Sequence, residues 1–413
     1  MMNEFVLLDG TKVYHYKTDK FKSISVRLMF PAPLNKEKYM AHDILGVMLS
    51  TSNKKYPKEN DYTRYLKGLY QTRMGAYFNV VGNWEFFNIE FSILNSKYFD
   101  GEINLLKEIF EIANDIFVNA DLTKEKFEKR KNLKKQQICG NISKRSYAYK
   151  QFRRYMYDNV LEDPYQNKEQ AINDLKYEDV LEVYNELSSR GCKLLIVGDV
   201  TEEEITSAYG NHIFNRGNKI PNFVRTLKYV DVEEPKIIEE AANSRQSHLY
   251  MGYRTNILWN AKDTYTLAIL NYMLAGDSFS TLFKEIREKR SLAYNVSINK
   301  SSNNTIVIYT GINAEDYEET VSVINEVLND YAEGRIDPNV LEMSKLALSD
   351  GTITEYDRIG YYCDYVYNCA WGFQTIKLED RIKIADSITI EDIMKLSKRL
   401  QLDTSFFLRG ELW

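Results

Sequence analysis

The fold of this chain is first indicated by Ile24-Ser-Val-Arg-Leu-Met-Phe30, in which apolar and polar residues alternate as in a half-buried strand. The second half holds a counterpart, Ser247-His-Leu-Tyr-Met-Gly-Tyr253. Further along, each half carries a short apolar strand, Lys193-Leu-Leu-Ile-Val-Gly-Asp199 in the first and Ser405-Phe-Phe-Leu-Arg-Gly-Glu411 in the second. This common order of elements predicts an internal duplication.

Helical stretches occupy corresponding places between these strands, at Ile103 to Phe117 and at Glu318 to Tyr331. Each is followed by a signal for a new helix, Asp121-Leu-Thr123 in the first half and Asp337-Pro338 in the second. Strands, then helices, then a final strand are typical of an α+β fold. We therefore predict two similar domains, each a mainly antiparallel sheet with helices packed on one face.

The boundary between the domains is indicated by a polar segment, Asn215 to Glu240, which contains Pro221 and Pro235. The predicted division is an N-terminal domain at 1–220, a linker at 221–243 and a C-terminal domain at 244–413.

The composition excludes several classes of function. The 413 residues carry a net charge of −5. The chain therefore lacks the surplus of basic residues that would indicate nucleic acid or an anionic membrane as a partner. The basic stretch Lys124 to Lys135 is interpreted as the solvated face of a helix. Residues 1–20 show no signal peptide, and no run is long enough to span a membrane. The four scattered cysteines form no C-x-x-C pair, which favours a reducing cytoplasm.

The most specific motif is Leu282-Phe-Lys-Glu-Ile-Arg-Glu-Lys-Arg-Ser-Leu-Ala-Tyr294, which follows a small-residue turn. Together with Asp163-Pro-Tyr165, Asp174 to Val180 and Leu194 to Asp199, it resembles the insulinase-like or mitochondrial-processing-peptidase-like zinc peptidases. The resemblance covers nearly the whole chain. It implies that the two domains form half of a clamshell, and it is closest to the metal-less partners of bacterial two-subunit peptidases.

Members of that family bind zinc through H-x-x-E-H on a helix of the first half and a Glu on a later helix. The matching segment here is Ala41-His-Asp-Ile-Leu-Gly-Val-Met-Leu49, which can be aligned in two registers. One register places the motif on His42, Leu45 and Gly46, and the other places it on Asp43, Gly46 and Val47.

Neither register keeps a general base or a second imidazole. The later Glu falls near Gln136 and Gln137, and an amide is a poor zinc ligand. Zinc hydrolysis needs about three protein ligands and a carboxylate base. We therefore expect no metal and no cofactor in this chain.

In the family, the second half supplies an Arg and a Tyr seven residues apart, and Arg287 and Tyr294 have that spacing. The resemblance implies that the Arg holds a substrate carbonyl and that the Tyr supports the transition state near the scissile bond. Both could lie on one helical face, although a helix ending near Arg287 and a strand opening at Tyr294 fits better. Ser291 replaces the usual Gly between them. The alternative is that Arg287 is solvated and Tyr294 packs on a sheet.

Two further patterns bear on the site. His15, His212 and His248 lack ligand spacing, and His42 with Asp43 is at most a remnant metal site. The resemblance implies that a substrate peptide adds as a strand to a sheet edge, with candidate edges at 76–81 and 295–299.

The resulting hypothesis is a non-catalytic subunit of a heterodimeric zinc peptidase, inactive alone. Its partner would be a homologous zinc-binding subunit, and its substrate a peptide or unfolded polypeptide. One alternative is a homodimeric pseudo-peptidase that binds peptides as a scaffold. Another is an active metallopeptidase with atypical ligands.

Overall fold

The computed structural model describes residues 2–81, 84–99, 103–140, 143–157, 168–217, 220, 230–257, 261–301, 305–373 and 375–411. The chain forms two compact units, and each is assembled from three separate stretches of sequence. Unit 1 comprises Met1–Gly140, Pro164–Thr226 and Asp357–Thr375. Unit 2 comprises Asn141–Asp163, Leu227–Tyr356 and Ile376–Trp413.

The strands of unit 1 are β1 Met2–Val6, β2 Lys12–Lys17, β3 Ser23–Pro33, β4 Arg73–Val81, β5 Trp84–Leu94 and β6 Lys193–Gly198. Its helices are α1 Tyr39–Thr51, α2 Glu59–Gly68, η1 Ser96–Tyr98, α3 Leu105–Val118, α4 Lys124–Cys139, α6 Lys168–Asp174, α7 Tyr177–Leu187, α8 Glu202–Tyr209 and α12 Ile359–Ala370.

The strands of unit 2 are β7 Lys236–Asn243, β8 Ser247–Arg254, β9 Ala293–Ser301, β10 Thr305–Ile312 and β11 Gln401–Glu411. Its helices are α5 Lys144–Tyr157, α9 Ala261–Ala275, η2 Phe283–Lys289, η3 Ala314–Asp316, α10 Tyr317–Ala332, α11 Pro338–Tyr356, α13 Leu378–Asp386 and α14 Ile390–Ser397.

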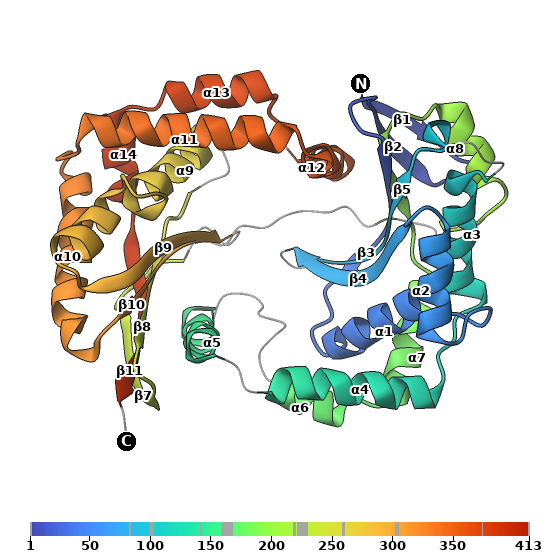
Figure 1. Ribbon diagram of the computed structural model, residues 1–413, viewed down its shortest axis with the longest axis horizontal. Coiled ribbons are helices and arrows are strands. Elements are labelled where there is room, and N and C mark those ends of the chain that lie inside the picture. Colours follow the sequence, from blue (N-terminus) through green and yellow to red (C-terminus); the bar gives the residue numbers. More distant parts are fainter. Residues whose placement is uncertain are drawn as a thin grey trace. The chain divides into compact units, whose positions relative to one another are not determined.

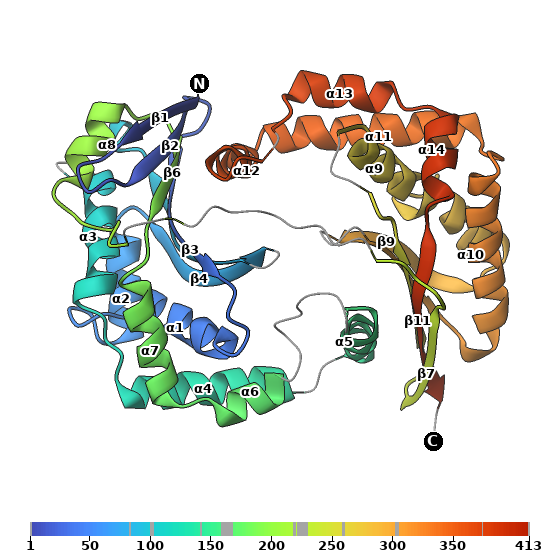
Figure 2. The ribbon, with the colours of Figure 1, turned by 180° about the vertical axis from the view of Figure 1, so that it is seen from behind.

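The two sheets share one topology (Figures 1 and 2). The strand order is β1-β2-β6-β3-β5-β4 in unit 1 and β7-β11-β8-β10-β9 in unit 2, so that, after β1, each strand of one sheet corresponds to a strand of the other. The pairs β2–β6 and β7–β11 are parallel, and the remaining pairs are antiparallel. The predicted α+β fold with an internal duplication is confirmed.

Each sheet buries one face under the main helical layer of its unit. In unit 1, Phe87 and Phe91 of β5 share a core with Ile109 of α3. In unit 2, Ile308 of β10 shares a core with Ile324 of α10. The alternation that predicted β3, β5 and β8 from the sequence is the alternation that fills these cores, since successive residues of a strand face opposite sides of the sheet.

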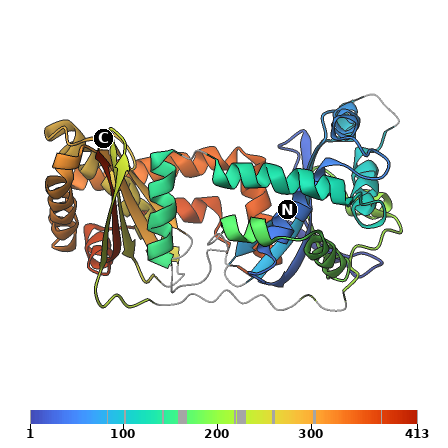
Figure 3. The same ribbon diagram turned by 90° about the horizontal axis from the view of Figure 1, so that it is seen from below.

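One additional helix lies against the other face of each sheet, and it comes from the opposite half of the sequence. Helix α12, from the second half, packs on β2 and β6 of unit 1, where the ring of Tyr362 lies 5.0 Å from that of Tyr16. Helix α5, from the first half, packs on β8 and β11 of unit 2 (Figure 3). The duplicated halves therefore exchange their equivalent helices.

A glycine allows α5 to approach its sheet closely. A Cβ on Gly252 of β8 would lie 2.3 Å from the sulfur of Met156 and 2.6 Å from the ring of Phe152. Met156 and Phe152 form a buried cluster with Tyr250, Phe406 and other residues of the sheet. The contact is part of the fold of unit 2, since a larger residue at this place would displace the helix.

The boundaries of the compact units therefore differ from the predicted domain boundaries. The division at 220 and 244 follows the order of the chain, whereas the units exchange one helix each. Residues 236–243 of the predicted linker form β7. This strand pairs with β11 in parallel and forms one edge of the sheet of unit 2. Residues 221–229 of that linker lie outside the described residues. In the described part of the chain, no helix has the length and apolar character needed to cross a bilayer.

Candidate functional site

His42 is a packed core residue of α1. Its exposed fraction is 1%, and its ring stacks on that of Phe78 with 4.0 Å between centroids. Nδ1 of His42 lies 3.2 Å from a carboxylate oxygen of Glu85. The other carboxylate oxygen of Glu85 accepts a bond of 2.5 Å from Arg190. The imidazole that opens the first register is therefore held in a buried cluster with Glu85 and Arg190.

The charge state of this cluster follows from its contacts. Burial would raise the pKa of Glu85, but the hydrogen bond and charge of His42 and the charge of Arg190 outweigh burial, and the pKa is lowered. Glu85 is thus held as a carboxylate. A carboxylate that is already engaged by Arg190 and by the ring of His42 is poorly placed to serve as a metal ligand or a general base.

The side chains at the remaining positions of the degenerate motif have different surroundings. The carboxylate of Asp43 forms an ion pair with Lys134 of α4. Leu45 is fully buried in the core, whereas Val47 is 37% exposed. In the second register, Asp43 is paired with the ammonium group of Lys134, and Val47 exposes an apolar side chain. These residues cannot form a set of metal ligands.

Gly46 belongs to both registers, and its surroundings exclude a side chain. A Cβ at this position would lie 2.8 Å from the carbonyl oxygen of Ala76 and 3.1 Å from the Cα of Tyr77. Helix α1 thus approaches the backbone of β4 at the place where the motif requires Glu or His. The packing of unit 1 therefore leaves no room at Gly46 for the side chain that the zinc motif requires.

Gln136 and Gln137 lie exposed on α4, near the position of the later Glu. Helix α4 begins at the predicted place, where Thr123 accepts a hydrogen bond from the backbone of Lys126. Over the described residues, no group of three or more His, Cys, Asp or Glu side chains could hold a metal ion. The residues present do not fit a zinc ion.

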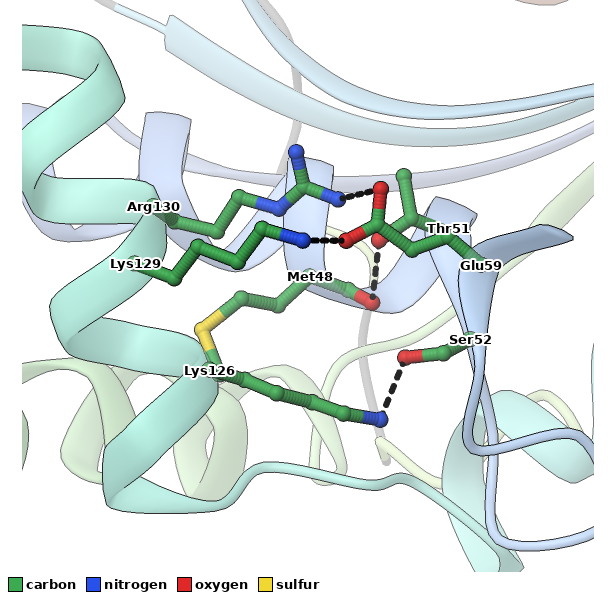
Figure 4. A pocket seen from close by; sticks show the side chains of 7 residues that line it. All are labelled: Met48, Thr51, Ser52, Glu59, Lys126, Lys129 and Arg130. Atoms are coloured by element: carbon green, nitrogen blue, oxygen red, sulfur yellow. Dashed lines mark hydrogen bonds and ion pairs between the residues drawn. The ribbon is translucent and has the colours of Figure 1, made fainter.

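A shallow hollow lies beside α1, between α2 and α4 (Figure 4). Its cations are engaged: Lys129 and Arg130 both contact the carboxylate of Glu59, at 2.7 and 2.8 Å. Bonding to Lys129 lowers the pKa of Glu59. The basic stretch of α4 is therefore partly neutralised by unit 1 itself, and the hollow offers no set of metal ligands.

Arg287 lies in η2, a π-helical turn, and is exposed. Its guanidinium carbon lies 4.8 Å from the centroid of the Phe283 ring. The neighbouring carboxylate of Glu285 accepts bonds of 2.6 Å from Lys289 and 2.6 Å from Arg290. Within the described residues Arg287 makes no ion pair, so its donors remain available while the Phe283 ring supports it.

The turn between η2 and β9 keeps a conformation that favours glycine. Ser291 has a φ of 54°, in the left-handed region. The amide of Leu292 then donates to the carbonyl of Ile286 at 2.9 Å, which closes the turn. The Ser that replaces the expected Gly therefore adopts the backbone geometry that a Gly would supply, at a cost in strain.

Tyr294 is the extra residue of a β-bulge in β9. Ala293 pairs with Ile312 and Asn295 pairs with Gly311, so Tyr294 has no residue opposite it on β10. Its exposed fraction is 70%, and β9 is the edge of its sheet. The prediction that Arg287 precedes a turn and Tyr294 opens a strand is confirmed, and η2 packs against β9. Bulges commonly reorient a side chain next to a functional site.

The other histidines have structural contacts. Nε2 of His15 lies 3.4 Å from the carbonyl of Gly198, and Nδ1 of His248 lies 3.1 Å from the hydroxyl of Tyr309. Burial lowers the pKa of both imidazoles. The residues that sequence reasoning missed are Glu85, Arg190 and Lys134, which engage the degenerate motif from distant positions and show no motif of their own.

The sequence is similar to those of known peptidase-like proteins. A family profile described as "Peptidase M16 inactive domain" matches residues 174–348. A Bacillus subtilis protein named "Probable inactive metalloprotease YmfF" is 25% identical over 97% of this chain and 96% of its own length. Residues 174–348 thus match the M16, or insulinase-like, peptidase family, and nearly the whole chain is similar to the Bacillus protein.

Two solved structures share the fold of this chain. A conserved protein from Enterococcus faecalis V583 aligns with a TM-score of 0.90 at 22% identity, over 100% of this chain and 99% of the other. A structure described as a peptidase M16 inactive domain from Pseudomonas fluorescens aligns with a TM-score of 0.76 at 14% identity, over 99% and 98%. The chain is thus similar to inactive M16 peptidase-family proteins, and it shares the fold of these two structures over nearly its whole length.

Proposed function

We propose that this chain is the non-catalytic subunit of a heterodimeric zinc peptidase and that Arg287 and Tyr294 complete the site of a zinc-bearing partner. The partner would be a homologous chain with an intact H-x-x-E-H helix. The substrate would be a peptide or an unfolded segment.

The observation that carries this proposal is the placement of Tyr294. A bulge on an edge strand turns its phenol out of the ladder, and within the described residues the hydroxyl has no hydrogen-bond partner. A tyrosine that only packed on a sheet would bury its ring and pair its hydroxyl. An unengaged phenol is a donor ready to stabilise an oxyanion that forms on a bound peptide.

The position of Arg287 supports the same role. Its charge is held by the Phe283 ring, while Glu285 is taken by Lys289 and Arg290. A guanidinium with free donors can donate hydrogen bonds to the carbonyl of a peptide that lies along the neighbouring edge strand. β9 is such an edge, and β4 is the corresponding edge of unit 1.

The metal must come from elsewhere, because α1 and α4 cannot bind it. Gly46 approaches the backbone of β4, and Asp43 is paired with Lys134. A partner that keeps the zinc would supply the nucleophilic water and the general base. This chain would supply the donors and an edge for peptide pairing.

The test is reconstitution of cleavage with a homologous H-x-x-E-H chain from the same genome. Tyr294→Phe should reduce the kcat of the complex about 100-fold, as expected when one oxyanion donor is removed. Arg287→Ala should reduce kcat/KM. Tyr98→Phe and Arg245→Ala remove an exposed phenol and an exposed guanidinium elsewhere and should leave cleavage unchanged.

The outcomes separate the candidate functions. Full cleavage by a complex that contains Arg287→Ala and Tyr294→Phe would contradict the proposal. Peptide binding by a homodimer of this chain, with no gain on addition of a zinc-bearing chain, would indicate a scaffold instead. Cleavage by the isolated chain that a chelator abolishes would indicate a metallopeptidase with atypical ligands.

A further inference from the structure

Helix α5 is rich in basic side chains. Its residues include five basic side chains and no acidic one, and its buried face is formed by Ala148, Phe152 and Met156. The basic residues are Lys144, Arg145, Lys150, Arg153 and Arg154. Lys144, Arg145 and Arg154 are exposed. This face is basic, although the whole chain has a net charge of −5.

The equivalent helix of the duplication shows that the fold does not require this charge. Helix α12 holds the same place on the sheet of unit 1, yet its sequence contains no Lys or Arg and one acidic residue, Asp364. Both helices cover their sheets with aromatic and aliphatic side chains. The basic residues of α5 are therefore an addition to the packing scheme that the two helices share.

Two of the three carboxylates on the adjoining strands have cationic partners outside α5. Glu239 pairs with Arg409, and Asp403 pairs with Arg254. Glu240 lies beside α5 and accepts a bond of 2.9 Å from the hydroxyl of Tyr147, so it offsets part of the charge of the helix. Two further cations lie at the end of the helix.

Lys236 donates to the carbonyl of Tyr155 at 2.7 Å, and Arg254 donates to the carbonyl of Met156 at 2.6 Å. Cations favour the C-terminal end of a helix; the charge of Arg254 is balanced by Asp403, so only Lys236 adds to the positive charge there.

This charge lies on the side of the sheet that leads to the β9 edge. The guanidinium of Arg145 lies 4.2 Å from the centroid of the Tyr309 ring on β10. Tyr309 pairs with Ser297 of β9, so both side chains share one face. A peptide added to β9 would run about 10 Å from β10, two strand spacings away. That distance exceeds the Debye length of about 8 Å at physiological salt, so the attraction should be weak there and stronger at low salt.

We infer that unit 2 selects an acidic peptide, whose carboxylate side chains face α5 when the peptide pairs with β9. This inference rests on the function proposed above and specifies its substrate class. In an extended strand, alternate side chains share a face, so acidic residues at every second position should be favoured.

The test is fluorescence anisotropy with the full chain and three synthetic peptides of equal length, with Glu, Gln or Lys at every second position. The Glu peptide should bind about three- to ten-fold more tightly than the Gln peptide, and the Lys peptide should bind more weakly than both. This preference should decline as salt is raised.

Matched variants locate the effect. Lys144→Gln/Arg145→Gln should remove most of the preference for Glu, and Lys144→Gln/Arg154→Gln should reduce it while leaving the contact of Arg145 with Tyr309. Lys124→Gln/Lys135→Gln on α4 removes the same charge from exposed positions of unit 1 and should change nothing. Thermal unfolding of each variant verifies that it is folded.

Failure of this inference is distinguishable from failure of the proposed function. Equal binding of the Glu and Gln peptides, or equal losses in the α4 and α5 variants, would overturn the acidic selectivity while peptide binding remains. No binding of any peptide, alone or with the zinc-bearing chain, would overturn both.

Discussion

The ammonium of Lys134 on α4 forms an ion pair with the carboxylate of Asp43 on α1. By family resemblance, these two helices are the ones that would carry zinc ligands. Here a side-chain cation joins them, and the neighbouring positions are closed by packing or left apolar. Four predictions follow from the contacts around this region and around the Tyr294 turn.

The isolated chain should be indifferent to zinc. A zinc site that binds only the folded state would add about 2.7 kcal/mol at 100 times its Kd. We expect no change in the Tm when zinc is added or when a chelator is added, as measured by calorimetry. A rise in Tm with zinc that the chelator reverses would show that a site exists.

Gly46→Ala should destabilise unit 1. The added methyl group would lie 2.8 Å from the carbonyl of Ala76, so α1 or β4 must shift, at a cost of about 1–3 kcal/mol in the free energy of unfolding. Gly68→Ala in α2 is the matched control, because nothing lies within 4 Å of its Cβ. The control should be neutral or stabilising by about 0.5 kcal/mol in urea unfolding. Equal effects of both changes would contradict the close approach.

Ser291→Gly should stabilise the chain. The φ of 54° at Ser291 is strained for a residue with a Cβ, and Gly removes that strain, with a gain of about 1 kcal/mol. Ser291→Ala tests the contribution of the hydroxyl, since Ala keeps the Cβ and should not be stabilising. If Ala and Gly raise the free energy of unfolding equally, the strain argument fails.

Glu85→Gln should alter the dependence of stability on pH. The pKa of Glu85 is lowered in the folded state, so the carboxylate stabilises the fold above its unfolded pKa of about 4.5. That stability is lost as the pH falls through the folded pKa. Removing the charge should cost on the order of 3 kcal/mol at neutral pH, because Arg190 and His42 lose their partner.

The measurement is urea unfolding at several pH values. The curves of the wild type and of Glu85→Gln should converge as the pH falls below 4.5, the pKa of an unperturbed Glu. Glu178→Gln, an exposed change on α7, should run parallel to the wild type. A constant difference between the wild type and Glu85→Gln across the range would show that the charge of Glu85 does not contribute.

The sequence predicted the elements of the fold because their signals are local. Alternation identified β3, β5 and β8, and the Thr123 cap identified the start of α4. The exchange of α5 and α12 was not foreseen, because an amphipathic pattern shows that a helix has an apolar face but not which sheet that face will cover.

The site was predicted only in part, for a similar reason. The positions of Arg287 before a turn and Tyr294 at the start of a strand were foreseen, but the bulge depends on pairing with β10. His42 contacts Glu85 of β5, and Glu85 in turn contacts Arg190 from the loop before β6, far along the chain. The roles of Arg287 and Tyr294, the zinc-bearing partner and the cytoplasmic location stay predictions.

The exchange of α5 and α12 has a consequence for synthesis on the ribosome. The first sheet can pair its strands early, but the helix that shields its second face is translated only after residue 358. A nascent chain would therefore expose Tyr16 and Phe86 until residues 359–371 have been translated. Fragments cut at the linker would each lack one covering helix, so they should aggregate when produced separately and recover by mutual complementation when produced together.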